Sequence, residues 1–371
     1  MADPICLFAV GDVAPRRDDP AAMLAAVEGL KGPADLLFGQ LECPLSDRGS
    51  PLPQARLAMR TDPGLARALR DAGFDAVSFA GNHCLDWGPD AFADTLEHVR
   101  AVGLALCGAG PDIAAARRPA IFERGGRRFA FLAYSSILPQ GYWAEAGRAG
   151  CAPLRAHTLQ AAPEHAPPGS SPAPLTFCHR ADLAALRDDV RAARTRADHV
   201  IVSVHWGIHF VAAQIADYQR EAAYAAIDAG ADAVIGHHPH VLKGVELHRG
   251  RPIFYSLGNF AIDQPQAFEA ELTSTRSFRE IAALNPGFDA ARRYILPPDS
   301  QRSMIARLAF GADGEVRAAF LPVMIDDDCL PARLAPQDPR FAEIATYVEA
   351  IGRTEGLANR YERAGGEVRL A

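Results

Sequence analysis

The stretch "VIGHHPHVLKGVE", residues 234–246, places three histidines within four positions directly after an apolar run. The run "ADAVIGHH" (231–238) has the length and composition of a buried β-strand. His237, His238 and His240 therefore fall at the C-terminal end of a predicted strand. In α/β sheets that end opens onto the crevice where ligands bind. The stretch predicts a metal site at the edge of an α/β sheet.

Short apolar runs alternate with segments of helical period on both sides of this stretch, which is typical of βαβ units. Further strands are predicted at 5–12, 35–42, 75–83 and 199–207, and helices at 20–30, 63–73, 90–103, 181–197 and 213–229. Hairpins are predicted to turn at Gly125-Gly126, Arg249-Gly250 and Asp313-Gly314. We expect one α/β domain over 1–330 with a mainly parallel or mixed sheet. Irregular stretches interrupt it at 137–178, either a lid or a disordered insertion, and at 261–302. Residues 331–371 are expected to be a helical extension (helix 338–364) packed on the same domain.

Each predicted strand ends in side chains that can bind a metal. The candidate ligands are Asp12, Glu42, Asn82, His205, His238 and His240, with His83 directly after Asn82. Taken singly, Asp12 reads as a turn or helix-cap residue and His205 as a core histidine. Their shared place at strand ends favours a common metal site. If "HPH" is extended, His238 and His240 point to one side and His237 to the other. His237 is then expected behind the ligands or against substrate, and His209 on the surface.

The donor types suggest which metal is bound. Imidazole nitrogen combined with carboxylate and amide oxygen suits Mn²⁺, Fe, Zn²⁺ or Ni²⁺, whereas Ca²⁺ or Mg²⁺ prefers oxygen alone. One or two divalent ions are expected. A carboxylate can bridge two ions about 3.5–4 Å apart, and Glu42 is the natural candidate for that role.

The composition excludes several classes of protein. The chain has 371 residues and a net charge of −7, so it offers no basic surface for nucleic acid. Its seven cysteines show no CxxC pair, and neither a signal peptide nor an apolar run of spanning length is present. We expect a cytoplasmic protein with no membrane partner, and the oligomeric state is left open.

At these residues the sequence resembles the CapA-type (poly-γ-glutamate biosynthesis) branch of the calcineurin-like metallophosphatase superfamily. The segments that carry the resemblance are "GDVAPR" (11–16), "GQLECPLSDRG" (39–49), "FAGNHCLDWG" (79–88), "VSVHWGIHF" (202–210), "VIGHHPHVLKGVE" (234–246) and "GRPIFYSLGNFAID" (250–263). The resemblance implies a four-layer αββα sandwich with two central mixed sheets. It also implies that the six candidate ligands bind metal.

The resemblance extends to roles for further residues. His83 would be the catalytic histidine, oriented by Asp86, with Asp12 as a ligand that also takes part in catalysis. Trp87, Ser256 and Asn259 would line the site, and His237 and Trp206 would support the ligands or contact substrate.

The chain departs from ordinary metallophosphatases in its first two motifs. It has Asp12-Val13-Ala14 where they have Asp-x-His, and Glu42 where they have Asp. The loss of an imidazole ligand argues against plain phosphomonoester hydrolysis.

Three functional hypotheses follow. The first is a cytosolic metal-dependent epimerase that inverts the Cα of the C-terminal residue of a ribosomal, lasso-type precursor peptide. There the cation would stabilise the enediolate formed on deprotonation. The second is a phosphoesterase or amide (γ-glutamyl) hydrolase that uses metal-bound hydroxide with His83 as general acid. The third is a non-catalytic scaffold with a vestigial site.

Overall fold

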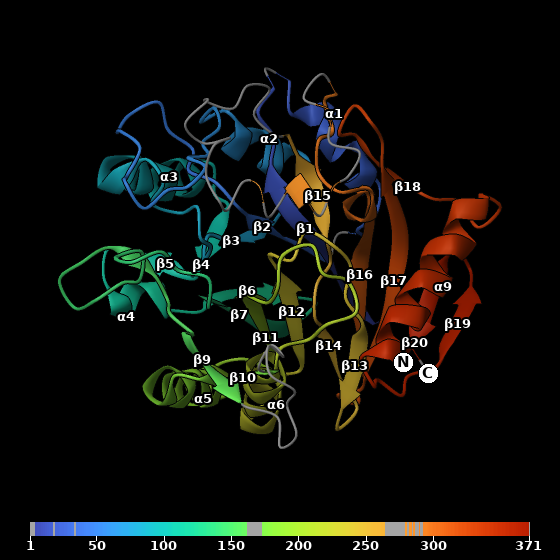
Figure 1. Ribbon diagram of the computed structural model, residues 1–371. Coiled ribbons are helices and arrows are strands. Elements are labelled where there is room, and N and C mark those ends of the chain that lie inside the picture. Colours follow the sequence, from blue (N-terminus) through green and yellow to red (C-terminus); the bar gives the residue numbers. More distant parts are fainter. Residues whose placement is uncertain are drawn as a thin grey trace.

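The computed structural model describes the chain except for residues 1–3, 18, 33–34, 162–172, 264–278, 280–281, 284, 286–288, 290–291 and 371. Two large mixed sheets form its centre (Figure 1). The first sheet has the order β19 (Tyr361–Ala364), β20 (Glu367–Leu370), β17 (Val316–Ile325), β16 (Arg302–Phe310), β1 (Ile5–Ala14), β2 (Leu36–Leu41), β3 (Ala76–Ser78) and β4 (Ala105–Cys107), with β15 (Asn259–Ile262) beside β1 and β18 (Pro331–Arg333) beside β17. The second has the order β13 (Val245–His248), β14 (Arg251–Phe254), β12 (Ala233–His237), β11 (His199–His205), β7 (Arg127–Ser135) and β6 (Ala120–Arg124).

Helices cover the outer faces of both sheets, so the layers run helix, sheet, sheet, helix (Figure 1). The helices on the side of the first sheet are α1 (Ala21–Leu24), which continues as the 3₁₀ turn η1 (Ala25–Val27), α2 (Leu65–Asp71) and α3 (Gly88–Ala101). On the side of the second sheet lie α5 (Arg180–Arg194) and α6 (Asp217–Ala229). The other elements are α4 (Ile113–Ala116), η2 (Pro298–Gln301), and α9 (Pro339–Thr354), which packs against β17. This is the four-layer α/β sandwich expected from the sequence.

The central strands are buried along their whole length, because each has a sheet on one face and helices on the other. Every residue of β1, β2, β11 and β12 is buried. This explains why these strands read as continuous apolar runs rather than as alternating ones. Between the two sheets, the rings of Phe38 in β2 and Phe131 in β7 stack with centroids 5.3 Å apart. The two sheets therefore share a core that fixes their relative position.

The three predicted hairpins are confirmed, as β6–β7, β13–β14 and β16–β17. The expected irregular stretch 137–178 differs, because its described part contains β8 (Gly150–Cys151), paired with β5 (Ala109–Gly110), and the antiparallel pair β9 (Ala156–Ala161) and β10 (Ala173–Cys178). The stretch 261–302 lies largely outside the described residues.

The C-terminal region is built into the first sheet. The helix predicted over 338–364 ends at Thr354, and Gly356 follows with φ +76°. After this turn β19 and β20 form a hairpin, and β20 pairs with β17. The division at residue 330 stays a prediction.

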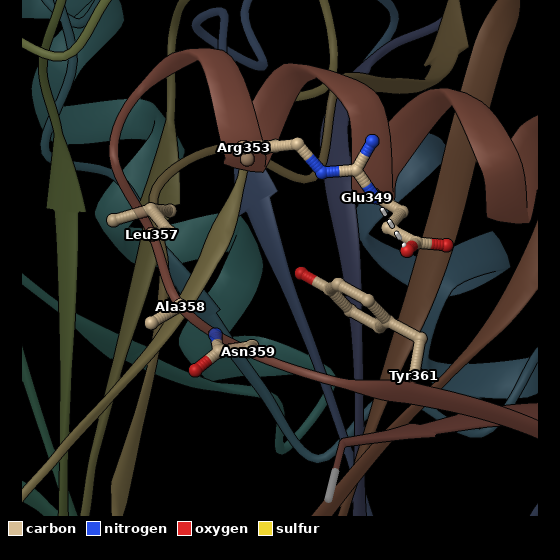
Figure 2. Close-up of a pocket in the computed structure, with 7 residues that line it drawn as sticks. Glu349, Arg353, Leu357, Ala358, Asn359 and Tyr361 are labelled. Atoms are coloured by element: carbon tan, nitrogen blue, oxygen red, sulfur yellow. Dashed lines mark hydrogen bonds and ion pairs between the residues drawn. The ribbon is translucent and has the colours of Figure 1, made fainter.

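A cavity of about 250 Å³ lies between the end of α9 and the segment that follows it (Figure 2). Glu349 and Arg353 line it and form an ion pair of 2.9 Å. Tyr361 and Asn359 also line it, and both donate hydrogen bonds to the carbonyl oxygen of Val245. None of the predicted site residues lines this cavity. Within the described part of the chain, no helix has the length and apolar character needed to cross a membrane.

Candidate metal centre

The predicted ligands come together where the C-terminal ends of strands from both sheets meet. Asp12 lies near the end of β1, Glu42 directly follows β2, and Asn82 lies in the loop between β3 and α3. From the second sheet, His205 is the last residue of β11, while His238 and His240 follow β12. The two sheets touch at this point, because the backbone N–H of His238 donates to Asp12 Oδ2 at 3.2 Å.

Close approach of backbone at Gly11 positions Asp12. A Cβ at Gly11 would lie 2.0 Å from the carbonyl oxygen of Gly258, at the start of β15. The strand register of β1 shifts at Asp12, where its N–H donates to that same carbonyl at 3.2 Å. Only glycine, which has no Cβ, allows β1 and the segment before β15 to approach this closely. The shift turns the Asp12 carboxylate toward the second sheet.

Asp12, Glu42 and His240 form a first group of donors, whose ligand atoms all lie within 4.8 Å of one another. His240 Nδ1 is 3.4 Å from Asp12 Oδ2, and His240 Nε2 is 3.4 Å from Glu42 Oε1. Asn259 Oδ1 lies 2.8 Å from His240 Nδ1 and, as an amide oxygen, can only accept its proton. That proton leaves Nε2 with a lone pair facing Glu42, as a metal ligand requires.

Asn82, His205 and His238 form a second group. His205 Nε2 lies 2.7 Å from Asn82 Oδ1 and 3.1 Å from His238 Nδ1. A single ring proton cannot satisfy an amide oxygen and an imidazole nitrogen together, whereas one cation can bind all three atoms. The six candidate ligands are thus divided into two groups of three. Whether Glu42 bridges two ions stays a prediction.

The buried charge of the site fits divalent cations. Asp12 Oδ1 and both carboxylate oxygens of Glu42 are buried without a hydrogen-bond partner. Burial raises the pKa of Asp12 to about 8. The pKa of Glu42 is also raised, first by burial and then by the negative charges of Asp12 and Asp86. Two buried carboxylates facing imidazoles are costly when nothing compensates them, and a divalent ion would remove that cost. The residues therefore fit one or two such ions.

The backbone of the histidine segment differs from the expectation. His238 has φ +94° and His240 has φ +57°, so the segment turns rather than staying extended. Non-glycine residues rarely adopt positive φ, and each such residue stores of order 1–3 kcal/mol of strain. Alternation along an extended segment therefore does not determine where these two side chains lie, and that part of the prediction was wrong. The turn sends His238 and His240 to different donor groups.

His237 lies behind the candidate ligands. Its ring is fully buried, with Nδ1 3.6 Å from Asp12 Oδ1 and its centroid 6.3 Å from that of Phe38. Burial lowers its pKa to about 3, so it is a neutral imidazole packed under Asp12. Of the two other residues predicted near the site, Asn259 contacts His240, whereas Ser256 accepts a hydrogen bond of 3.1 Å from the Gly258 N–H and shapes the turn before Asn259.

His83 and Asp86 form a hydrogen-bonded pair beside the two groups. His83 Nδ1 lies 2.6 Å from Asp86 Oδ2, and the His83 side chain is 15% exposed while Asp86 is buried. Asp86 also accepts from the Met59 N–H at 2.9 Å and from the Tyr142 hydroxyl at 3.2 Å. These donors compensate the buried carboxylate and fix its orientation. Next in the chain, Trp87 has the Arg60 guanidinium 3.6 Å from its ring centroid.

Trp206 was predicted to support the ligands or to contact substrate. Its side chain is fully buried in the core between the second sheet and its helices, where Nε1 donates to the carbonyl oxygen of Tyr255 at 3.0 Å. This burial excludes contact with substrate, so that alternative was wrong, and support of the ligands stays a prediction. His209 was expected on the surface, and that expectation was wrong. Its ring stacks on His238 with centroids 3.9 Å apart. The signal for this placement is Gly207, whose φ of +93° turns the chain back after His205.

Comparison with known proteins identifies the family of the chain. The family profile described as "Bacterial capsule synthesis protein PGA_cap" matches residues 6–264. The "PGA biosynthesis protein CapA" of Bacillus subtilis (strain 168) is 30% identical over 240 residues, which cover 64% of this chain and 56% of that protein. A "probable polyglutamine synthesis accessory protein" of Mycobacterium tuberculosis (strain CDC 1551 / Oshkosh) is 30% identical over 247 residues, covering 64% of this chain and 60% of that protein. The chain thus spans less than two thirds of these relatives.

A longer match comes from an uncharacterised protein, y4sH, of Sinorhizobium fredii (strain NBRC 101917 / NGR234). It is 28% identical over 412 aligned residues, covering 97% of this chain and 85% of that protein. The matched family segment contains all six candidate ligands and the His83–Asp86 pair. The chain belongs to the bacterial capsule synthesis (PGA_cap) family, the CapA-type branch of the metallophosphatase-like superfamily.

Proposed function

We propose that this chain is a metal-dependent enzyme that epimerises the Cα of the C-terminal residue of a peptide, by removing its proton from one face and adding a proton on the opposite face. His83 and a carboxylate of the site such as Asp12 would be the two groups that exchange these protons. The observation that carries the proposal is the short hydrogen bond between His83 Nδ1 and Asp86 Oδ2. An ionised carboxylate only accepts, so the ring proton is held on Nδ1 and Nε2 keeps its lone pair. His83 is then ready to act as a base.

His83 has the surroundings that proton abstraction requires. Its side chain is partly exposed, so substrate can reach it, and Asp86 stabilises the imidazolium formed when Nε2 takes the proton. Burial is the main cause that lowers the pKa of His205, His238 and His240, and a protonated His83 would lower it further, in line with a position of His83 beside the donor groups. When bound, divalent ions of the Mn²⁺, Fe, Zn²⁺ or Ni²⁺ type would hold the substrate carboxylate and stabilise the negative charge of the deprotonated carbon.

Hydrolysis is the second candidate. The bond cleaved would be an amide (γ-glutamyl) bond or a phosphoester. The names of the relatives favour the amide, because two of them refer to PGA or polyglutamine synthesis. In that reaction His83 would have to carry a second proton on Nε2 and give it to the leaving amine. The same residues serve both reactions. A peptide substrate and a cytoplasmic location stay predictions, as does the absence of nucleic-acid and membrane partners.

The experiment is a mass-spectrometric assay in D₂O with Mn²⁺-loaded protein and short peptides with free C-termini. Epimerisation predicts a gain of one deuteron at the terminal residue and formation of the D-isomer, without cleavage. His83→Gln should lose the exchange. Asp86→Asn places an amide donor against Nδ1, which moves the ring proton to Nε2, so it should slow exchange by about 10³–10⁴-fold. Cleavage, or release of phosphate from an aryl phosphate, would replace this proposal with hydrolysis.

A further inference from the structure

Gln40 is a fully buried glutamine near the end of β2, beside the metal centre. It lies opposite Asp12 in the parallel pair of β1 and β2. Side chains alternate along a strand, so Gln40 points to the same face as Phe38, whose ring stacks on Phe131 of the second sheet. The Gln40 amide therefore lies between the two sheets, at the level of Asp12.

The hydrogen bonds of Gln40 fix the direction of its amide. Nε2 donates to the carbonyl oxygens of Ala80 at 3.1 Å and of Leu41 at 3.3 Å. An amide oxygen in that position would face two other acceptors, so the nitrogen must lie there. A Cβ at Gly81 would lie 3.3 Å from Gln40 Nε2 and 3.7 Å from His205 Nε2. The amide nitrogen is thus on the side of the second donor group, and Oε1 points away from it.

Oε1 of Gln40 is buried without a hydrogen-bond partner. Asp12 Oδ1 and both carboxylate oxygens of Glu42, on the same two strands or directly after them, are in the same state. With the carboxylates ionised, all four oxygens only accept, so none of them can satisfy another. Buried polar atoms of proteins normally have a partner. A cation would satisfy all four oxygens together.

We propose that Gln40 is a further metal ligand, and that its Oε1 binds the same ion as Asp12, Glu42 and His240. With Gln40 included, the first donor group offers oxygen from three residues and nitrogen from one imidazole. Carboxylate and carbonyl oxygens are the ligands that suit Mn²⁺ and other hard divalent cations. The amide adds an oxygen without adding to the buried negative charge.

The two donor groups then suit different ions. The second group offers two imidazole nitrogens and one amide oxygen, from His205, His238 and Asn82. Imidazole-rich sites suit Zn²⁺ or Fe, so this group is the better site for such an ion, and the group with Gln40 is the better site for Mn²⁺. This inference concerns metal binding alone and holds whether the chain epimerises or hydrolyses its substrate.

The first test measures metal affinity and needs no turnover. Mn²⁺ and Zn²⁺ are titrated separately into full-length protein that has been freed of metal with EDTA. Gln40→Met keeps the length of the side chain but removes the amide, and should weaken Mn²⁺ binding at least about tenfold while weakening Zn²⁺ binding less. Gln40→Glu keeps an oxygen donor and should bind Mn²⁺ more tightly than Gln40→Met does.

Gln219→Met is the matched control. Gln219 lies in α6 and is also fully buried, with Oε1 accepting from the Ala216 N–H at 2.9 Å and Nε2 without a partner. The same chemical change at this position should leave the Mn²⁺ affinity at the wild-type value. Equal losses of Mn²⁺ affinity in Gln40→Met and Gln219→Met would overturn the inference, because they would show a general effect of losing a buried amide.

A spectroscopic measurement separates a ligand from a residue that only supports the fold. Wild-type protein labelled with ¹³C at the side-chain carbonyl of glutamine and loaded with Mn²⁺ should show a ¹³C hyperfine coupling in electron–nuclear double resonance spectra. The coupling should persist in Gln219→Met and vanish in Gln40→Met. A wild type without the coupling would overturn the inference even if Gln40→Met did not fold, and so would a coupling that persists in Gln40→Met. Failure of epimerisation in D₂O with the coupling intact would reject the proposed reaction but not this ligand.

Discussion

The buried carboxylate of Asp12 should make the metal-free protein less stable as the pH rises. Its pKa is about 8 in the folded chain and 3.8 as the ordinary value. Between these values the folded state keeps a proton that the unfolded state has lost, so the free energy of unfolding falls as pH increases. The shift of 8 − 3.8 = 4.2 units, at 1.36 kcal/mol each, sets a ceiling of about 6 kcal/mol by pH 8.

Asp12→Asn removes the titrating group and keeps an amide oxygen for the His238 N–H. In EDTA, the variant should match the wild type near pH 4.5 and exceed it by several kcal/mol near pH 8.5, in urea unfolding curves at both values. Saturating Mn²⁺, at 100 times its Kd, should return about 2.7 kcal/mol to the wild type and less to the variant, because Asp12→Asn weakens only the first donor group. Parallel pH dependences of the two proteins would refute the reasoning, because they would show that Asp12 ionises without cost.

Three further substitutions test how the site is supported. Asn259→Ala should weaken metal binding about 10–100-fold in a metal titration, since His240 loses the acceptor that fixes its proton; unchanged affinity would show that Asn259 is dispensable. Gly236→Ala would place a Cβ 2.2 Å from a backbone carbonyl oxygen and should cost about 3 kcal/mol in denaturant unfolding, whereas Gly147→Ala, with open space around it, should cost less than about 0.5 kcal/mol. Lys243→Met should lower stability by about 3 kcal/mol, because the carbonyl oxygens of Ala212 and Gln214, in the loop after His209, lose their donor, and an unchanged unfolding midpoint would contradict this role.

The gathering of the ligands was predictable because it depends on a short-range signal. An apolar run that ends in a polar residue indicates both a buried strand and the position of its C-terminal end. Parallel strands then bring their C-terminal ends to one edge of the sheet. Asp12, Glu42, His205 and the histidine segment all carry this signal, and the structure places them together.

The detailed arrangement of the site could not be predicted, because it depends on contacts between residues that are distant in sequence. The conformations of His238 and His240 follow from the way their segment meets Asp12, more than 200 residues earlier in the chain. His209 is held against the site by Lys243, an anchor that no periodicity reveals. Trp206 directly follows the candidate ligand His205, yet alternation along the strand turns the Trp206 side chain into the core on the other side of the second sheet. For the same reason proximity in sequence was a poor guide to which aromatic residues line the site.

The place of β1 in the first sheet has a consequence for synthesis of the protein. β1 is made first, yet it pairs on one side with β16, whose residues 302–310 are translated almost 300 residues later. Non-local pairing of this kind closes slowly, and incomplete sheets expose strand edges. Asp12 cannot meet its histidine partners until the ribosome has passed residue 240. The set of candidate ligands is thus incomplete until residue 240 of 371 has been made, so any ion would be bound only after that point.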